Sequence, residues 1–277
     1  MFHRFLSPAK LNLGLKIVGK RADGYHLLKS IFCLIDLYDQ IEIQLTDNGK
    51  ISLIEHNQAW FYQKDLAYKA AIVLREYTQT PLGANIKIKK VIPSGAGMGG
   101  GSSNAASVLI ILNQLWQANL DVTALSAIGE TLGADIPFFI RGVNAMVSGI
   151  GEIIEEIKLP QLYFVIIKPD FHVPTKDVFN NLKLDFTNIQ PDHVNMDFLL
   201  TTRENDLEQV VKSLYPQINS IFSELAQYGT PVMTGSGSAI YLTFTDKNSA
   251  KNVANILTPR YNTYLATSLS KSPVACV

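Results

Sequence analysis

The chain has 277 residues, which is long enough for one large domain or two ordinary domains with separate hydrophobic cores. Its 24 basic residues balance 24 acidic ones and form no block of like charge, so nucleic acid and membrane surfaces are poor candidates as partners. No apolar run approaches the roughly 20 residues of a membrane span, and charged residues interrupt the N-terminal segment before a signal-peptide core forms.

The cysteines and histidines indicate a reducing compartment. Cys33 and Cys276 are the two cysteines and lack the spacing of a thiolate metal site or a disulfide framework. The five histidines do not occur at the i, i+4 spacing of helical metal ligands. The sequence therefore predicts a cytoplasmic protein.

Residues 1–92 mix strand and helix patterns. In residues 9–15, Leu11, Leu13 and Leu15 alternate with polar residues, which predicts a strand with Lys10 and Asn12 on the face away from the core. Further segments with a clear period are a strand at 40–45, a strand at 51–55 returning beside it, a helix at 66–77 and a strand at 85–92.

A glycine-rich segment follows the last of these strands and leads into a helix predicted at 103–117. Five glycines fall within residues 95–101, more than a simple turn needs. A glycine turn at a helix start presents free backbone N–H groups and the positive end of the helix dipole, which favours a phosphate site over a merely flexible turn. The segment consists of Pro93, Ser94, Gly95, Ala96, Gly97, Met98, Gly99, Gly100, Gly101, Ser102 and Ser103.

Two common phosphate-loop patterns do not fit this segment. The Walker pattern requires a lysine after its second glycine, but Gly101 occupies that position. The dinucleotide pattern requires an acid at the end of a second strand, whereas Asp121 follows the predicted helix and is better placed to cap a helix at 122–132.

The rest of the chain predicts an α+β protein of two domains, residues 1–157 and 158–277. A strand at 144–150 ends the first domain, and the pattern restarts near residue 157. The second domain is predicted to contain strands at 162–168, 239–244 and 261–267 and helices at 175–182, 206–214, 218–228 and 248–257.

Residues 93–106 resemble the ATP loop of the GHMP kinases, a family named after galactokinase and the homoserine, mevalonate and phosphomevalonate kinases. Three further segments resemble the same family in the expected order, at residues 7–26, 132–139 and 234–239. The resemblance implies a ribosomal-protein-S5-like N-terminal domain, a ferredoxin-like C-terminal domain and an active site in the cleft between them. It also implies ATP as the phosphate donor, bound at residues 93–103, with Mg²⁺.

Two segments, Ala9-Lys10-Leu11-Asn12 and Asp23-Gly24-Tyr25-His26, narrow the resemblance to a GHMP kinase whose small-molecule substrate is a cytidine-diphosphate-linked methylerythritol. The resemblance implies phosphorylation of its tertiary 2-hydroxyl. A cytosine ring needs a flat apolar partner and edge hydrogen bonds, which Tyr25 and His26 can supply. The substrate-binding residues implied are Asn12, Tyr25, His26, Thr175 and Phe179.

Lys10 and Asp135 are the implied catalytic pair. The pattern alone leaves Lys10 open as an edge-strand lysine, and Asp135, between Gly133 and Pro137, open as a turn aspartate. The resemblance implies that Asp135 accepts the hydroxyl proton or orients the hydroxyl, while Lys10 polarises acid, alcohol or both.

The metal ligands and the donor base contacts are less defined. Ser102 and Ser103 are placed to cap the helix or to help hold Mg²⁺, and no carboxylate pair for the metal is evident. Residues 235–239 suggest a second backbone anion site. Related kinases carry Asn-Leu at the adenine edge where this chain has Asp65-Leu66, and a carboxylate cannot donate a hydrogen bond as an amide does.

Two alternatives follow from the same residues. One is a GHMP kinase acting on homoserine or mevalonate, against which the Tyr25-His26 motif argues. The other is a non-catalytic nucleotide-binding protein on the same fold, against which the presence of both Lys10 and Asp135 argues. The sequence does not indicate an oligomeric state.

Overall fold

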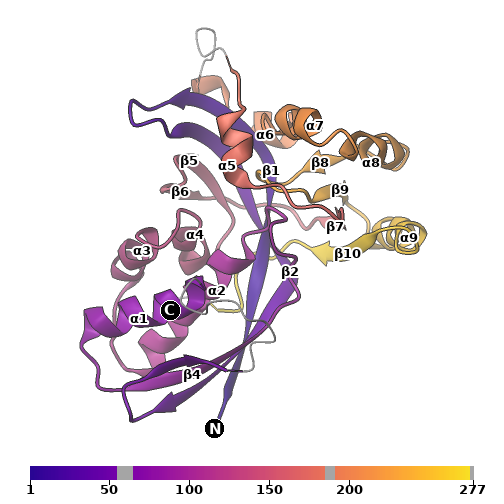
Figure 1. Cartoon of the computed structure of the whole chain (residues 1–277). Coiled ribbons are helices and arrows are strands. Elements are labelled where there is room, and N and C mark those ends of the chain that lie inside the picture. The colour runs from indigo at the N-terminus through magenta and orange to yellow at the C-terminus, as the bar shows by residue number, and fades with distance from the viewer. Residues whose placement is uncertain (55–64, 185–190, 275–277) are drawn as a thin grey trace.

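Two long antiparallel strands form the spine of the molecule. The computed structural model describes residues 1–54, 65–184 and 191–274. Strand β1 (His3–Lys20) pairs with β2 (His26–Thr46) from His3↔Ile43 to Lys20↔His26, with register shifts along the way. In Figure 1 both strands run through the centre of the molecule, between the helices of the N-terminal half and the C-terminal domain.

The N-terminal sheet has the order β3-β4-β2-β5-β6, with β1 also paired to β2. Its other strands are β3 (Ile51–Leu53), β4 (Gly83–Lys89), β5 (Ala145–Gly149) and β6 (Ile153–Glu156). The predicted return of residues 51–55 beside 40–45 was wrong. Strand β4 occupies that edge of β2 over Gln40–Thr46, so β3 adds in parallel outside β4.

Four helices cover one face of this sheet and bury its first core. They are α1 (Leu66–Thr78), α2 (Gly100–Leu115), α3 (Val122–Glu130) and α4 (Ile136–Arg141). Phe32, Leu34, Ile41 and Ile43 of β2 pack against them. Helix α2 is buried on every side from Ser103 to Asn113, which explains its almost entirely small and apolar composition.

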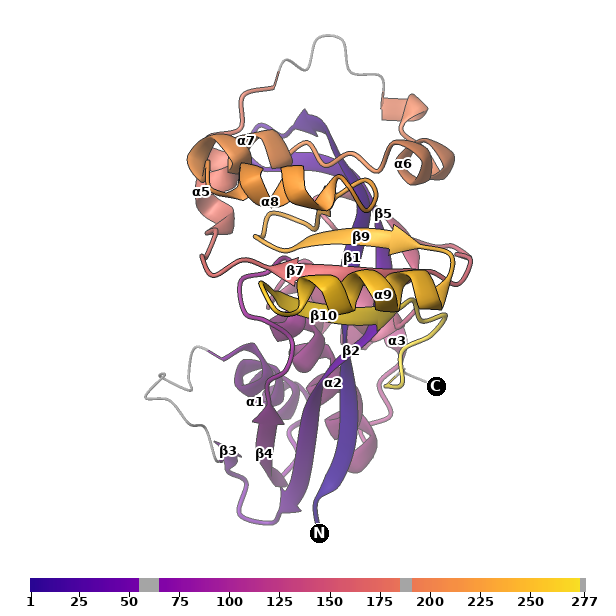
Figure 2. The ribbon, with the colours of Figure 1, turned by 90° about the vertical axis from the view of Figure 1, so that its right-hand side faces the viewer.

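The C-terminal domain is ferredoxin-like, as the family resemblance implied. Its strands are β7 (Tyr163–Lys168), β8 (Val232–Met233), β9 (Ile240–Phe244) and β10 (Asn262–Thr267), in the order β10-β7-β9-β8. Its helices are α5 (Thr175–Asn180), α6 (Met196–Thr202), α7 (Glu208–Leu214), α8 (Ile218–Leu225) and α9 (Lys247–Leu257). Figure 2 shows this sheet crossing β1 and β2, with α8 and α9 on its outer side.

The position of β1 between the two halves corrects the sequence prediction for that strand. Every residue from 7 to 15 is buried, so the polar residues do not face solvent. Leu11 and Leu13 pack in a core shared with Phe164 and Tyr241 of the C-terminal sheet. Because the other face is covered as well, Lys10 and Asn12 are held inside the protein at 4% and 1% exposure.

Helices α4 and α6 and the course of the C-terminal segment were not predicted. Pro137 does not prevent α4, because it lies in the first turn of this helix, where its missing N–H is not needed. Residues 268–274 leave β10 and return to the N-terminal half, where Leu269 donates its N–H to the carbonyl oxygen of Leu34. The predicted division of the chain into two domains at residue 157 did not include this return of residues 268–274 to the N-terminal half. No helix in the described ranges has the length and apolar composition required to cross a membrane.

Candidate active site

The glycine-rich segment connects β4 to α2 through three left-handed glycines. Gly95, Gly97 and Gly99 have φ values of +65°, +79° and +69°. Gly99 is the N-cap residue of α2, so the helix begins at Gly100 and not at residue 103, and its cap is a glycine instead of a serine. A residue with a side chain would be strained at these angles, whereas glycine adopts them freely. The unbonded N–H groups of the first helical turn remain available for an anion.

Ser103 is occupied by the packing of α2 on β1. It is fully buried and donates to the carbonyl oxygen of Pro8 at 2.6 Å, and its hydroxyl lies 2.7 Å from that of Ser7. These contacts fix the start of α2 against the strand that carries Lys10. Neither Ser102 nor Ser103 caps α2. Ser102 lines the neighbouring cavity, whereas Ser103 is not among the described residues that do so.

One large cavity brings the predicted residues together. Its volume is about 1110 Å³, and ten of the eleven residues of the segment 93–103 line it. The predicted catalytic and substrate-binding residues also line it: Lys10, Asn12, Tyr25, His26, Asp135, Thr175 and Phe179. Residues from β1, the β1–β2 turn, the glycine segment, the start of α4 and α5 thus converge on one space. A cavity of this size can hold two ligands of nucleotide class.

Lys10 and Asp135, two of the residues that line this cavity, form an ion pair. Lys10 Nζ lies 3.9 Å from Asp135 Oδ2, donates to Asn12 Oδ1 at 2.5 Å and lies 4.2 Å from the centroid of the Phe32 ring. Burial lowers the pKa of Lys10, and the carboxylate of Asp135 partly offsets this effect. Asp135 is the residue before α4, and its side chain makes no capping hydrogen bond to that helix. Its carboxylate is 33% exposed, and the residue lines the cavity.

A buried hydrogen-bond network that includes Thr234 holds Asn12 in place. The sequence placed Thr234 within the family segment 234–239 but gave it no role of its own. The Asn12 side chain donates to Ser30 Oγ at 2.9 Å, and its backbone N–H donates to Thr234 Oγ1 at 3.0 Å. The Thr234 hydroxyl also lies within hydrogen-bond distance of Asn12 Oδ1, at 3.3 Å, and of the carbonyl oxygen of Gly97, at 3.4 Å. Thr234 therefore links the strand of Lys10, the glycine segment and the turn at 234–239.

That second glycine turn packs directly on the first. A Cβ atom added at Gly237 would lie 2.2 Å from the carbonyl carbon of Ala96, so only glycine permits this approach. Gly235 and Ser236 line the cavity, and the Ser236 hydroxyl lies 2.7 Å from that of Thr175 at the start of α5.

The cavity wall near the β1–β2 turn is aromatic. The His26 and Phe179 rings lie 5.4 Å apart at 30°, while Tyr25 is 62% exposed. Burial, with a smaller effect of the Lys20 charge, lowers the pKa of His26 below its ordinary 6.5, so the imidazole is neutral at pH 7. A neutral imidazole both donates and accepts hydrogen bonds, which suits the edge of a base.

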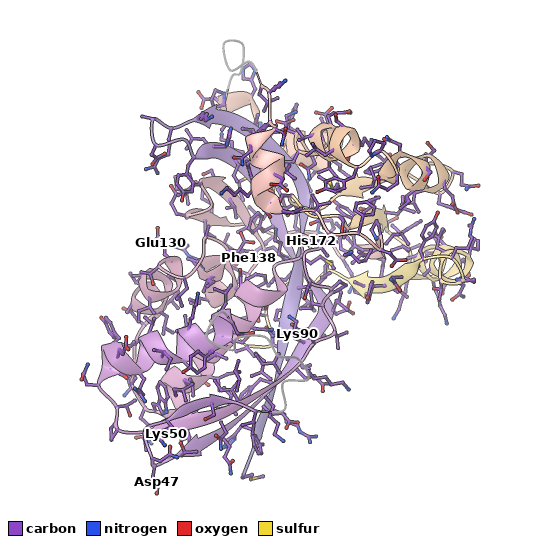
Figure 3. All side chains as sticks on the ribbon, in the orientation of Figure 1. Asp47, Lys50, Lys90, Glu130, Phe138 and His172 are labelled. Carbon is purple, nitrogen blue, oxygen red and sulfur yellow. The ribbon has the colours of Figure 1, made fainter. Side chains whose placement is uncertain are left out.

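The opposite wall is lined by Asp65, Leu66, Ile88, Lys90 and Ile92. Asp65 Oδ1 accepts from the N–H groups of Ala67 at 2.8 Å and Tyr68 at 3.3 Å, so this carboxylate caps α1. Lys90 was not singled out by the sequence, because a lysine at the end of a strand carries no signal. Figure 3 shows Lys90 near the centre of the molecule, with His172 of the C-terminal domain above it.

Substitution of Gly97 by Ala is expected to disrupt this site. The added Cβ would lie 2.1 Å from the carbonyl oxygen of Thr234 at a φ of +79°, so the glycine segment must move. We expect the Kd for ATP to rise by at least about tenfold, measured by calorimetric titration. Gly49→Ala is the control, because its φ of +65° and a Cβ contact of 3.2 Å impose strain far from the cavity. An unchanged Kd in Gly97→Ala would contradict the assignment of this segment.

Comparisons with known proteins place the chain in a family. The family model described as the GHMP kinases N terminal domain matches residues 65–143, and the model described as GHMP kinases C terminal matches residues 192–263. The chain is 44% identical to a 4-diphosphocytidyl-2-C-methyl-D-erythritol kinase from Neisseria meningitidis serogroup A, over 99% of this chain and 97% of that protein. It is 38% identical to the kinase of the same name from Vibrio cholerae, over 97% and 92% of the two chains.

Solved structures show the same relationship. A crystal structure of 4-(cytidine 5'-diphospho)-2C-methyl-D-erythritol kinase matches with a TM-score of 0.84 at 33% identity, covering 96% of this chain and 99% of that one. A mevalonate kinase structure matches with a TM-score of 0.73 at 15% identity, covering 97% of this chain and 100% of that one, which shows a shared fold. The chain therefore belongs to the GHMP kinase family.

Proposed function

We propose that this protein transfers the terminal phosphoryl group of ATP to the tertiary 2-hydroxyl of 4-diphosphocytidyl-2-C-methyl-D-erythritol. The observation that carries the proposal is the Lys10–Asp135 pair, whose atoms lie 3.9 Å apart in the cavity that both the glycine segment and the Tyr25–His26–Phe179 wall line. Relatives that are 44% identical over almost the whole chain carry this kinase name. The reaction belongs to the methylerythritol phosphate route to isoprenoid precursors.

ATP is assigned to the end of the cavity formed by α2 and β4. The triphosphate would lie on the backbone N–H groups of residues 95–102, where the α2 dipole also favours negative charge. The base would lie toward Leu66 and Ile88, two apolar residues of the opposite wall. Because Asp65 accepts hydrogen bonds from α1, its effect on donor preference remains a prediction.

Mg²⁺ fits this site as a partner of the triphosphate. Among the described residues, no group of three His, Cys, Asp or Glu side chains is placed to hold a metal. Mg²⁺ commonly keeps several waters and binds through phosphate oxygens with few protein ligands. Ser102, in the first turn of α2, is one of the residues that line the cavity, and its hydroxyl is our candidate for such a contact. When bound, Mg²⁺ would neutralise part of the phosphate charge.

The transfer is a direct in-line displacement. The acceptor hydroxyl oxygen bonds to the γ-phosphorus as the bond to the bridging oxygen breaks, ADP leaves, and the hydroxyl proton passes to the Asp135 carboxylate. Lys10, buried with its charge, orients Asp135 and stabilises the charge that develops on the transferred group. Because phosphoryl transfer depends mainly on positioning, Asp135 can contribute as an orienter as well as a base.

The aromatic wall is assigned to the cytosine ring of the acceptor. We expect Tyr25→Ala to raise the KM for the acceptor by about tenfold and to leave the KM for ATP unchanged, because a stacked base contributes about 1–3 kcal/mol. Initial rates at varied concentrations of each substrate measure both constants. The matched control is Tyr77→Ala, since Tyr77 is 60% exposed on α1 and Tyr25 is 62% exposed. An acceptor KM equal in the two variants would remove Tyr25 from the pocket.

The test of the proposed function is ADP release from MgATP by the purified protein. Reactions would contain the cytidine-diphosphate-linked methylerythritol, mevalonate, homoserine or no acceptor. Stimulation by the cytidine compound alone supports the proposal. Stimulation by another alcohol would retain the kinase chemistry and discard the cytosine pocket, and ATP binding without ADP release would favour a non-catalytic nucleotide-binding protein.

A cytoplasmic location remains a prediction. Among the described residues, Cys33 is a buried free thiol whose pKa burial raises to about 12. A free cysteine is compatible with a reducing compartment.

A further inference from the structure

A buried carboxylate outside the cavity contacts both ends of the ATP segment. Asp39, in β2, is 0% exposed and is not among the described residues that line the cavity. Its Oδ1 accepts the N–H groups of Val91 at 2.7 Å and Ile92 at 2.9 Å. Its Oδ2 accepts Asn104 Nδ2 at 2.9 Å and also Lys90 Nζ. Four donors therefore converge on one carboxylate.

These donors lie on both sides of the glycine segment. Lys90, Val91 and Ile92 directly precede the glycine segment. Asn104 lies in the second turn of α2, the helix into which the glycine segment leads. Lys90, Ile92 and Asn104 all line the cavity. Asp39 thus contacts the residues where the segment leaves the sheet and the helix on which it ends. Through these neighbours it reaches the ATP end of the cavity without touching it.

The Asp39 side chain also takes the place of a backbone hydrogen-bond acceptor where the pairing of β2 with β4 ends. The β2–β4 ladder runs from Thr46↔Gly83 to Gln40↔Lys89 and stops one residue before Asp39. Beyond it, the N–H groups of Val91 and Ile92 donate to the Asp39 side chain instead of to a backbone carbonyl. The carboxylate therefore sets the direction in which the chain departs toward Gly95.

A carboxylate suits this position because it accepts only. Asparagine has a single acceptor oxygen and an NH₂ group, which would face at least one of the existing donors. A buried donor that loses its acceptor costs about 1–3 kcal/mol, so the segment would shift to find new partners. The positive charge of Lys90 compensates the buried negative charge of Asp39. In Asp39→Asn this ion pair would be lost as well.

We propose that Asp39 is a positioning residue for ATP, which holds the glycine segment, Lys90 and the start of α2 in the arrangement that binds the nucleotide. This role rests on the proposed use of that segment for ATP. It predicts a loss in nucleotide binding that is separate from any general loss of stability.

The test compares Asp39→Asn with Asn144→Asp. Asn144 is 4% exposed, accepts the N–H of Leu34 at 2.8 Å and donates to the carbonyl oxygen of Leu269 at 2.8 Å, away from the cavity. Asp39→Asn changes a carboxylate to an amide, and Asn144→Asp makes the opposite change, each in a buried hydrogen-bond network. For Asp39→Asn we expect the Kd of a non-hydrolysable ATP analogue to rise about ten- to hundredfold, with the acceptor KM within about twofold of wild type. For Asn144→Asp we expect lower thermal stability and an unchanged Kd.

Hydrogen–deuterium exchange without nucleotide separates this inference from the proposed function. Faster exchange of residues 91–102 in Asp39→Asn, but not in Asn144→Asp, supports the positioning role even if the ATP assignment is wrong. Equal exchange and equal analogue Kd in Asp39→Asn and wild type would overturn it. If Asp39→Asn does not fold, Asn104→Ala removes one of the four donors, and a several-fold higher Kd is expected. An unchanged Kd in that variant would likewise overturn the proposal.

Discussion

Asp135→Asn is expected to lower kcat by about 10²- to 10⁴-fold, with the KM for ATP changed by less than about threefold. The amide has the shape of the carboxylate but cannot accept the hydroxyl proton or attract the Lys10 ammonium, 3.9 Å away. Steady-state rates with both substrates varied give the two constants. A parallel fall in kcat and in ATP affinity would contradict the catalytic assignment, because it would indicate a damaged nucleotide site.

The same variant makes a prediction about pH. Burial already lowers the pKa of Lys10, and the Asp135 charge opposes that shift. An opposite charge favours the protonated amine, so its removal lowers the pKa of Lys10 further. The residual activity of Asp135→Asn should therefore decline at a lower alkaline pH than that of the wild type. An unmoved alkaline limb would show that the two residues are not electrostatically coupled.

Lys10→Met is expected to lower kcat by about 10²-fold or more without lowering the melting temperature. Methionine has a similar length and can pack on the Phe32 ring, where Lys10 Nζ lies 4.2 Å from the centroid. A buried ammonium costs desolvation free energy, so its removal compensates for the lost hydrogen bond to Asn12. Asp135 is 33% exposed and can be hydrated when its partner is removed.

Calorimetry and steady-state kinetics together measure this effect. The control is Lys16→Met on the same strand, because Lys16 pairs with Glu204 and Asp206 and is not among the described residues that line the cavity. That variant should lose some stability and retain its turnover. If Lys10→Met and Lys16→Met lose the same fraction of kcat, Lys10 has no special place in the reaction.

Local patterns determined the parts of this protein whose structure depends on neighbours in sequence. The helix periodicity predicted α1, α2, α3 and α9, and the apolar run before Lys168 predicted β7. The glycines at 95, 97 and 99 indicated a phosphate segment because their left-handed conformations are a local property of the chain. Recognition of the family followed from four such motifs, and its implied fold was confirmed.

The sequence was least informative where a residue's surroundings come from distant segments. Lys10 reads as a lysine on an amphipathic strand, but it is buried because the face of β1 that it shares with Asn12 is also covered, and there it lies beside Phe32 and Asp135. Ser103 reads as a helix cap, but Gly99 is the N-cap residue of α2 and Ser103 donates to the carbonyl oxygen of Pro8 in β1. Asp39 carries no local signal at all, since its four donors come from segments far along the chain.

The sequence by itself thus determined the fold family, the glycine segment and part of the set of residues that line the cavity. Tertiary structure decided which groups meet: Lys10 with Asp135, as the resemblance implied, Asn12 with Thr234, and Asp39 with both ends of the glycine segment. The physical reason is that backbone preferences and hydrophobic periods act over a few residues. The charge and hydrogen bonding of a site depend instead on groups from distant parts of the chain that tertiary packing brings within about 4 Å of one another.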